Sequence, residues 1–245
     1  MWGTVIGTAY ANTFMRREIK YLLTAELEAA ILDRIHDFMT EDVFSQQTNG
    51  SLYCDSPDDA LIRASLEKPV YKQKLRLRTY GTPDDDSIAF LEIKKKFQGV
   101  VYKRRAQTTY REAMEYLNGG AIPVCTGYND AQVIQEVDWL IKRFQLSPKT
   151  AIFYDRRAFH ANDDPEVRLT LDRNVRYRCD ELDLCSGTSG ILLKSQPHCV
   201  MEIKSAGAIP LWLTHILTEL SLFPGSFSKY GTAYRERSGR QAVKI

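Results

Sequence analysis

The strongest constraint on this chain is a set of strand-length segments in which basic and apolar residues alternate. In residues 72–80, every second position from Lys74 to Arg78 is basic, and leucine or threonine fills the positions between. Successive side chains of a β-strand point to opposite faces of a sheet. The segment is therefore predicted to be a strand with one cationic face and one apolar face.

The same alternation recurs elsewhere, with at most one glutamate on each cationic face. It is found at Glu92 and Lys94, at Lys103 and Arg105, at Glu18 and Lys20, and at Glu202 and Lys204. Residues 72–105 hold ten of the 33 basic residues in 34 of the 245 positions, about twice their proportional share. The apolar faces can pack under helices. The formal net charge of +2 therefore conceals a segregated distribution.

Rows of like charge on neighbouring strands indicate a site for a polyanion. Cross-strand cations repel one another, and a solvated sheet face usually mixes the two signs. Phosphates fit such a site, because arginine binds their oxygens bidentately and lysine supplies a point charge. The interspersed glutamates point to a divalent metal, which takes oxygen ligands and bridges phosphates. A solvated sheet face is the alternative interpretation.

Hydrophobic periodicity and turn residues predict an α+β fold with a largely antiparallel sheet. Helices are expected at about 24–39, 57–67, 109–117, 130–144 and 211–220. Strands are expected at 16–22, 51–55, 72–80, 88–97, 100–108, 150–159, 167–173 and 199–205. Gln98-Gly99 is expected to turn one hairpin. Residues 231–245 are polar and are predicted to be a frayed tail.

Composition is typical of a globular protein in water, with 44% hydrophobic and 26% charged residues. We expect a single domain over 1–245, with its core at about 16–230. The chain has no apolar run long enough for a spanning helix and no signal-peptide pattern at its start. Its five cysteines lack the spacing of a zinc site and favour reduced thiols. A cytoplasmic protein is expected, with any membrane association made through a partner.

Together these segments resemble the VTC domain, the polyphosphate polymerase domain of the vacuolar transporter chaperone family, which belongs to the CYTH-like triphosphate tunnel metalloenzymes. Nine segments carry the resemblance in the family's order: 17–21 (REIKY), 51–55 (SLYCD), 74–81 (KLRLRTYG), 90–94 (FLEIK), 99–105 (GVVYKRR), 154–159 (YDRRAF), 167–172 (VRLTLD), 201–204 (MEIK) and 227–230 (FSKY). The resemblance implies an antiparallel β-barrel tunnel flanked by helices, with basic side chains pointing inward.

The resemblance also implies an activity, namely transfer of the γ-phosphoryl group of ATP to a growing polyphosphate chain with Mn²⁺ or Mg²⁺. The residues expected to act in catalysis are Arg156, Lys229 and Lys94. Those expected to bind substrate, from the motifs and the alternation together, are Lys20, Lys74, Arg76, Arg78, Lys103, Arg105, Tyr154, Arg168, Lys204 and Ser228. Glu202 is the expected metal ligand, with Glu18 as the second. Glu18 and Glu92 could instead pair with neighbouring cations, which is favoured over metal ligation, and packing in the barrel is the alternative for Tyr154.

Two departures from the family patterns bear on function. Tunnel phosphatases often begin with Glu-x-Glu-x-Lys, whereas this chain has Arg16-x-Glu18-x-Lys20 and lacks the first glutamate. This departure favours the polymerase branch over a hydrolase. The yeast-type domain has a lysine where this chain has Ser226, so the grip on the outgoing polymer could be weaker here.

Three functions remain open on the sequence: a polymerase, a triphosphate or polyphosphate hydrolase using the same site, and a non-catalytic binding module that serves a membrane-protein partner. The expected ligands are ATP or another nucleoside triphosphate and inorganic polyphosphate. Specific nucleic-acid binding is disfavoured, because the cations lie on strands rather than on a recognition helix.

Overall fold

The computed structural model describes residues 17–43, 46–98, 100–124 and 127–242. Arg16, at the start of the first expected strand, and Gly99, in the expected hairpin turn, lie outside these ranges. Residues 243–245 of the expected tail also lie outside them.

Ten described strands form one sheet, in which every pairing is antiparallel. They are β1 (Arg17–Leu23), β2 (Met39–Glu41), β3 (Gln47–Asp55), β4 (Tyr71–Tyr80), β5 (Ile88–Phe97), β6 (Val100–Thr109), β7 (Ser147–Ala161), β8 (Arg168–Arg178), β9 (Ile191–Leu192) and β10 (Cys199–Ser205). The order is β1-β10-β8-β7-β3-β4-β5-β6, while β2 pairs with β7 and β9 with β8. The predicted antiparallel α+β fold is confirmed.

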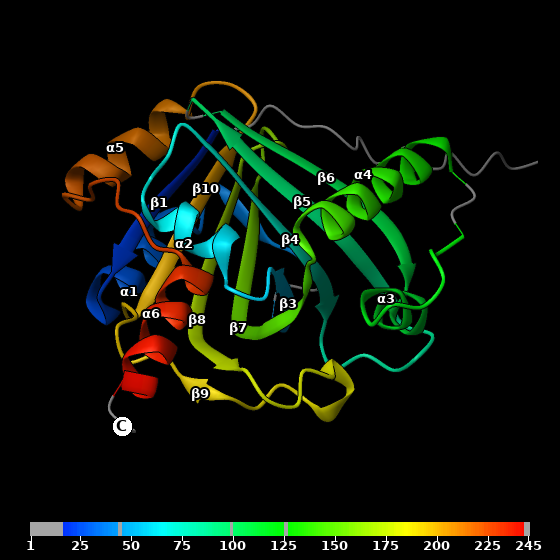
Figure 1. Cartoon of the computed structure of the whole chain (residues 1–245). Helices are drawn as coiled ribbons and strands as arrows, with labels where there is room; N and C mark the ends of the chain where they lie inside the picture. The colour runs from blue at the N-terminus through cyan, green and yellow to red at the C-terminus, as the bar shows by residue number, and fades with distance from the viewer. Residues whose placement is uncertain (1–16, 44–45, 99, 125–126, 243–245) are drawn as a thin grey trace, which may run out of the picture.

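The sheet curls so that strands near the two ends of this order face each other across its inside (Figure 1). Glu18 on β1 and Lys94 on β5 form an ion pair of 2.6 Å, although five strands lie between theirs in the sheet. Only a curved sheet brings these two side chains together. We call the face that carries them the inner face. In the described residues, the edge strands β1 and β6 do not hydrogen-bond to each other.

Helices cover the outer face in two pairs (Figure 1). The pairs are α1 (Ala25–Ile35) with α5 (Leu211–Glu219), and α3 (Tyr110–Leu117) with α4 (Tyr128–Phe144). The first pair packs on β1, β8 and β10, and the second on β4, β5 and β6. Leu75, Leu77 and Ile93 are at most 1% exposed in the second core. The apolar halves of the alternating strands therefore point outward to the helices, which leaves the charged halves inside.

The C-terminal segment corrects one prediction. Residues 231–245 were expected to be a frayed tail, but α6 (Lys229–Ala242) is a helix. It contacts β7 and β8 and packs against α2 (Ala60–Leu66), which itself lies on β3 and β4. Tyr230 and Ala233 are buried in this third core, and Tyr234 packs against it. Their i, i+3, i+4 spacing defines a narrow apolar stripe that the polar composition of the segment conceals.

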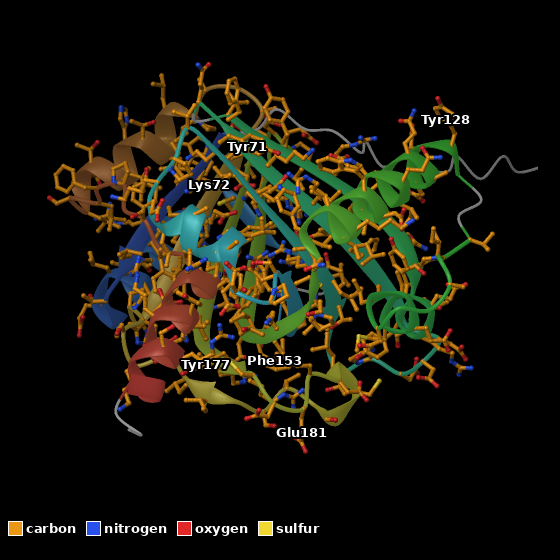
Figure 2. All side chains as sticks on the ribbon, viewed as in Figure 1. Tyr71, Lys72, Tyr128, Phe153, Tyr177 and Glu181 are labelled. Carbon is orange, nitrogen blue, oxygen red and sulfur yellow. The ribbon has the colours of Figure 1, made fainter. Side chains whose placement is uncertain are left out.

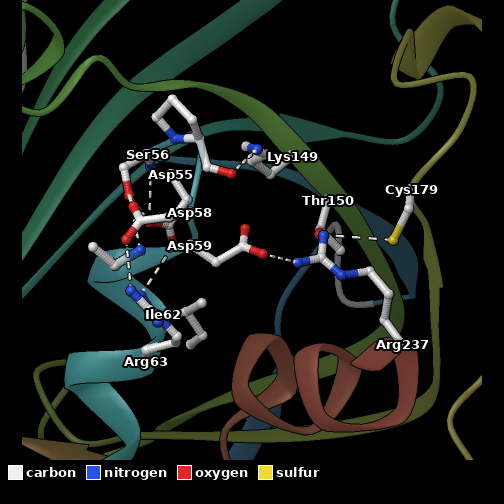
Figure 3. A network of polar contacts seen from close by, with 12 residues as sticks. Asp55, Ser56, Asp58, Asp59, Ile62, Arg63, Lys149, Thr150, Cys179 and Arg237 are labelled. Atoms are coloured by element: carbon white, nitrogen blue, oxygen red, sulfur yellow. Dashed lines mark hydrogen bonds and ion pairs between the residues drawn. The ribbon is translucent and has the colours of Figure 1, made fainter. Parts of the chain in front are cut away.

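Buried polar contacts hold α6 against the body of the protein. The hydroxyl of Tyr230 donates to the Asp55 carboxylate over 3.0 Å, and the same carboxylate accepts the backbone N–H groups of Leu61 and Ile62. Figure 3 shows the neighbouring contacts, in which Arg237 of α6 pairs with the Asp59 carboxylate. These contacts also explain why α2 begins at Ala60 rather than at the expected Pro57, since side chains of the preceding turn cap its first N–H groups.

Two further boundaries differ from prediction for local reasons. The first helix ends at Ile35 instead of Met39, because Met39–Glu41 pairs with β7 as β2. The strand expected at 51–55 begins at Gln47 instead of Ser51, because β3 continues alongside β7. No helix in the described part of the chain is both long and apolar enough to cross a bilayer.

Replacing Tyr230 with phenylalanine tests how firmly α6 is held. The substitution removes a buried hydrogen bond to Asp55, and we expect the free energy of unfolding to fall by about 1–2 kcal/mol. Chemical denaturation measures the loss. Tyr102→Phe is the matched control, because Tyr102 is 41% exposed, and its effect should stay within about 0.5 kcal/mol. Equal effects of the two substitutions would contradict this account of α6.

Candidate functional site

The sheet register brings the predicted cations together on the inner face. Lys74 on β4 lies opposite Lys94 on β5, and Lys94 in turn lies opposite Lys103 on β6. On the other side of the curl, Lys20 on β1 lies opposite Glu202 on β10. Residues paired in this way share a face. The register therefore places the alternating charged residues on one face, as the sequence pattern predicts.

Glu92 is the centre of the first ion cluster. Its carboxylate is 1% exposed and lies 2.6 Å from Arg76, 3.4 Å from Arg78 and 2.6 Å from Lys103. Burial alone would raise the pKa of Glu92, but these cations hold it well below its ordinary value. Glu92 is thus a permanent anion that fixes the positions of the basic side chains. Pairing with neighbouring cations, rather than metal ligation, was the favoured interpretation of this residue.

Asp172 is the centre of the second cluster. Its buried carboxylate accepts two hydrogen bonds from Arg156, of 2.6 and 2.9 Å, and one of 2.6 Å from Lys229 at the start of α6. Burial would raise the pKa of Asp172, but Lys229 and Arg156 lower it far below the ordinary range. Asp172 is not among the residues predicted to form the site. The alternation Arg168-x-Thr170-x-Asp172 could have placed it on the inner face.

The third cluster joins Glu202 and Glu18. Glu202 accepts from Lys204 at 3.0 Å and lies 3.7 Å from Lys20, while Glu18 pairs with Lys94. Burial opposes ionisation of Glu18, but Lys94 lowers its pKa despite the nearby negative charge of Glu202. The two carboxylates are therefore ionised and close enough to interact.

This pair of carboxylates fits a divalent metal ion that is completed by substrate. In the ranges that the structure describes, no group of three or more His, Cys, Asp and Glu side chains could hold a metal ion on its own. Mg²⁺ is usually bound through one or two carboxylates together with substrate phosphates, and it needs no all-protein cage. Glu202 and Glu18 supply that number of ligands on the same cationic surface.

Aromatic residues lie among the cations. The Tyr154 ring is 3% exposed, with the Lys229 ammonium 4.3 Å and the Arg156 guanidinium 5.2 Å from its centre. Burial would raise the pKa of Tyr154, but Arg156, Arg78 and Lys229 lower it to about 7. Lys74 donates to the Ser228 hydroxyl over 3.3 Å. Both Tyr154 and Ser228 thus lie beside predicted site residues.

Two further predicted residues contact other side chains, although Arg105 lies opposite Glu92 in the register. Arg168 lies opposite Lys204 on the inner face, but its guanidinium pairs with Asp42, and its side chain is 41% exposed. The Arg105 guanidinium lies 4.7 Å from the centre of the Phe90 ring. A pocket of about 490 Å³ opens beside Arg156, between β3, β7 and β8. Its lining includes Arg156, Arg157 and Leu171.

The inner face as a whole is positively charged. Among the described residues, the three clusters and their neighbours contribute ten cations to it, which are Lys20, Lys74, Arg76, Arg78, Lys94, Lys103, Arg105, Arg156, Lys204 and Lys229, and four carboxylates, which are Glu18, Glu92, Asp172 and Glu202. The carboxylates orient the cations but cannot neutralise all of them. The remaining charge suits a polyanion of several phosphates.

Comparisons with known proteins agree with this geometry. The sequence profile of the VTC domain matches residues 15–236. Vacuolar transporter chaperone complex subunit 4 of Schizosaccharomyces pombe is 24% identical over 176 residues, which cover 64% of this chain. The match spans only 24% of that relative's length.

Solved structures share the fold at low sequence identity. A candidate adenylate cyclase of Bacillus halodurans has a TM-score of 0.56 at 15% identity, and the match covers 89% of this chain and 96% of that one. A candidate adenylyl cyclase of Hippeastrum, which has a dominant triphosphatase activity, has a TM-score of 0.50 at 15% identity, with 92% and 96% covered. These likenesses support the curled antiparallel sheet with flanking helices.

The buried lysines predict a pH dependence of anion binding. Burial lowers the pKa of Lys74 and that of Lys103 to about 8, so both side chains lose their charge as pH rises through that value. We expect tripolyphosphate affinity to fall between about pH 7 and about pH 9, by about tenfold for each lysine neutralised. Isothermal titration calorimetry measures the affinity.

Lys103→Arg is the control for titration of the ligand itself, because arginine stays charged across this range. The variant should lose less affinity than the wild-type protein at the higher pH. Identical pH profiles for the two proteins would show that Lys103 does not titrate as stated.

Proposed function

The chain belongs to the VTC domain family, and on that premise we propose that it is a polyphosphate polymerase. It would transfer the γ-phosphoryl group of ATP to a growing chain of inorganic polyphosphate. The observation that carries the proposal is the inner face itself, where ten cations surround four ionised carboxylates. Phosphoryl transfer depends on positioning and charge stabilisation more than on a protein nucleophile, and such a surface supplies both.

In this proposal the first cluster binds the triphosphate. Arg76, Arg78 and Lys103 converge on the buried Glu92, which holds them in place before the ligand arrives. Lys74 and Lys94 add charge from the same strands, β4 and β5, and Lys20 adds charge from β1 across the curl. Preorganised donors bind phosphate oxygens without the cost of ordering flexible side chains. Glu92 is therefore a positioning residue.

The second cluster acts on the transferred group. Arg156 and Lys229 are held side by side by Asp172, and they would offset the charge that develops on the phosphoryl group and on the attacking phosphate. The attacking phosphate is already an anion, so the reaction needs no general base. Ser228 and Tyr154 lie beside these cations and would orient the chain end.

A divalent metal completes the proposed site. Triphosphate tunnel enzymes generally use divalent metals, and we propose Mn²⁺ or Mg²⁺ here. Glu202 would hold the ion, with Glu18 as second ligand once Lys94 turns to phosphate. When bound, the ion would supply positive charge that stabilises the phosphate oxygens.

A triphosphate hydrolase is the second candidate function. The Hippeastrum protein with the same fold has a dominant triphosphatase activity. If water took the place of the attacking phosphate, the same cations would stabilise the transition state of hydrolysis.

The S. pombe relative is named as a subunit of a complex, and we propose that a partner protein links this domain to a membrane.

Incubation with ATP and Mn²⁺, followed by gel electrophoresis, tests the polymerase. A ladder of polyphosphates is expected, whereas free phosphate alone supports the hydrolase, and unchanged ATP with measurable binding supports a binding module. Glu202→Gln should lower the metal-dependent rate by about a hundredfold or more. Glu136→Gln is the matched control, because Glu136 pairs with Lys95 and Arg104 on the outer face. Full activity in Glu202→Gln would refute the metal assignment.

Tripolyphosphate binding tests the first cluster with two substitutions, one that removes a positive charge and one that removes a negative charge. Arg76→Gln should weaken binding about tenfold or more, since a charge-assisted contact is lost. Glu92→Gln should also weaken binding, although it removes a negative charge, because Arg76, Arg78 and Lys103 lose the carboxylate that orients them. Arg104→Gln, on the outer face of β6, should leave binding unchanged. A similar loss in all three variants would indicate a general effect on folding, which their melting temperatures would reveal.

A further inference from the structure

A pair of lysines extends the inner face beyond the three clusters. Lys72 on β4 lies opposite Lys96 on β5, one step outward from the pair formed by Lys74 and Lys94. Alternation along both strands places all four side chains on the same face. Lys72 lies four residues from Arg76, which is about 13 Å along a strand. The outer pair is thus well separated from the centre of the first cluster.

The outer pair differs from most of the inner cations in having no acidic partner. Arg76 faces Glu92, and Lys94 reaches Glu18. In the part of the chain described by the structure, no carboxylate forms an ion pair with Lys72 or Lys96. The Lys72 ammonium has one hydrogen bond, of 3.4 Å, to the backbone carbonyl oxygen of Ser65.

A third lysine adds to this charge. Burial lowers the pKa of Lys72, and the positive charges of Lys96 and Lys68 lower it further, so each of these two ammonium groups lies near that of Lys72. On β6, the residue opposite Lys96 is the apolar Val101. Like charges that face each other on adjacent strands are destabilising. Their presence at the open end of a cationic face points to an anion that offsets the repulsion.

We propose that Lys72 and Lys96, with Lys68 beside them, form a subsite for the part of a polyphosphate chain that extends past the triphosphate-binding clusters. This inference rests on the proposed function and deepens it, since it assigns the end of the inner face through which the polymer passes. Tripolyphosphate is held by the clusters and does not need the subsite. A longer chain contacts both.

The test compares two ligands of the same chemistry and different length. We expect Lys72→Gln/Lys96→Gln to weaken binding of long-chain polyphosphate about tenfold and to leave tripolyphosphate affinity within about twofold of wild type. The slope of affinity against salt for the long chain should fall by about two, because two cation–phosphate contacts are lost. Calorimetry at several salt concentrations measures both effects.

Lys142→Gln/Lys194→Gln is the matched control, because it removes the same charge from two exposed sites. Lys142 pairs with Asp138 on α4, and Lys194 follows β9. Figure 2 labels Lys72 at the end of the sheet away from β9. This control should bind both ligands as the wild-type protein does.

Three results would overturn the proposal. Unchanged long-chain affinity in Lys72→Gln/Lys96→Gln would leave the subsite without a function, and an equal loss for tripolyphosphate would place these lysines in the triphosphate site. Loss of binding to phosphatidylserine vesicles, with polyphosphate binding intact, would assign the lysines to a lipid surface. A wild-type protein that binds neither phosphate ligand would instead refute the proposed function on which the inference rests.

A charge reversal gives a second readout that does not depend on activity. In Lys96→Glu the new carboxylate faces Lys72, so the melting temperature should rise while long-chain affinity falls at least as far as in the double variant. A lower melting temperature together with unchanged long-chain affinity would contradict both the stated repulsion and the subsite.

Discussion

The structure depends on a curled sheet whose inner face holds many positively charged side chains close together. Burying cations without partners is costly, since each loses its hydration. Glu92, Asp172 and Glu202 solve this problem locally, because each carboxylate is shared by two or three basic side chains. The sharing leaves the surface with an excess of positive charge while every cluster still has an anion at its centre. Ligand phosphates can then compete for cations that are already oriented.

The same arrangement links distant parts of the chain. Asp172 on β8 binds Arg156 on β7 and Lys229 on α6, so the sheet and the last helix meet at one carboxylate. The main chain before α6 adds to this link, because Gly225 pairs with the backbone of Lys20, and Lys20 donates to the carbonyl oxygen of Phe227. The position of α6 therefore sets the shape of the candidate site.

Sequence alone predicted the faces of the strands but not the contacts between them. Alternation identified Arg76, Lys94 and their neighbours because strand geometry repeats every two residues. Asp172 was missed because its importance comes from partners 16 and 57 residues away, which only the register and α6 bring close. The α6 helix itself was missed because its stability comes from Tyr230 and Asp55, a tertiary contact, rather than from strong helix propensity.

The pairing of β1 with β10 has a consequence for how the protein is made. Ile19 lies opposite Ile203, so the first described strand finds its neighbour only after most of the chain has been synthesised. Contacts so distant in sequence close slowly, because a long loop must be ordered before it gains any stabilising contact. During this delay the apolar side of β1, with Tyr21 and Leu23, lacks the β10 neighbour that helps bury it. An apolar strand therefore lacks its sheet partner until β10 has been synthesised.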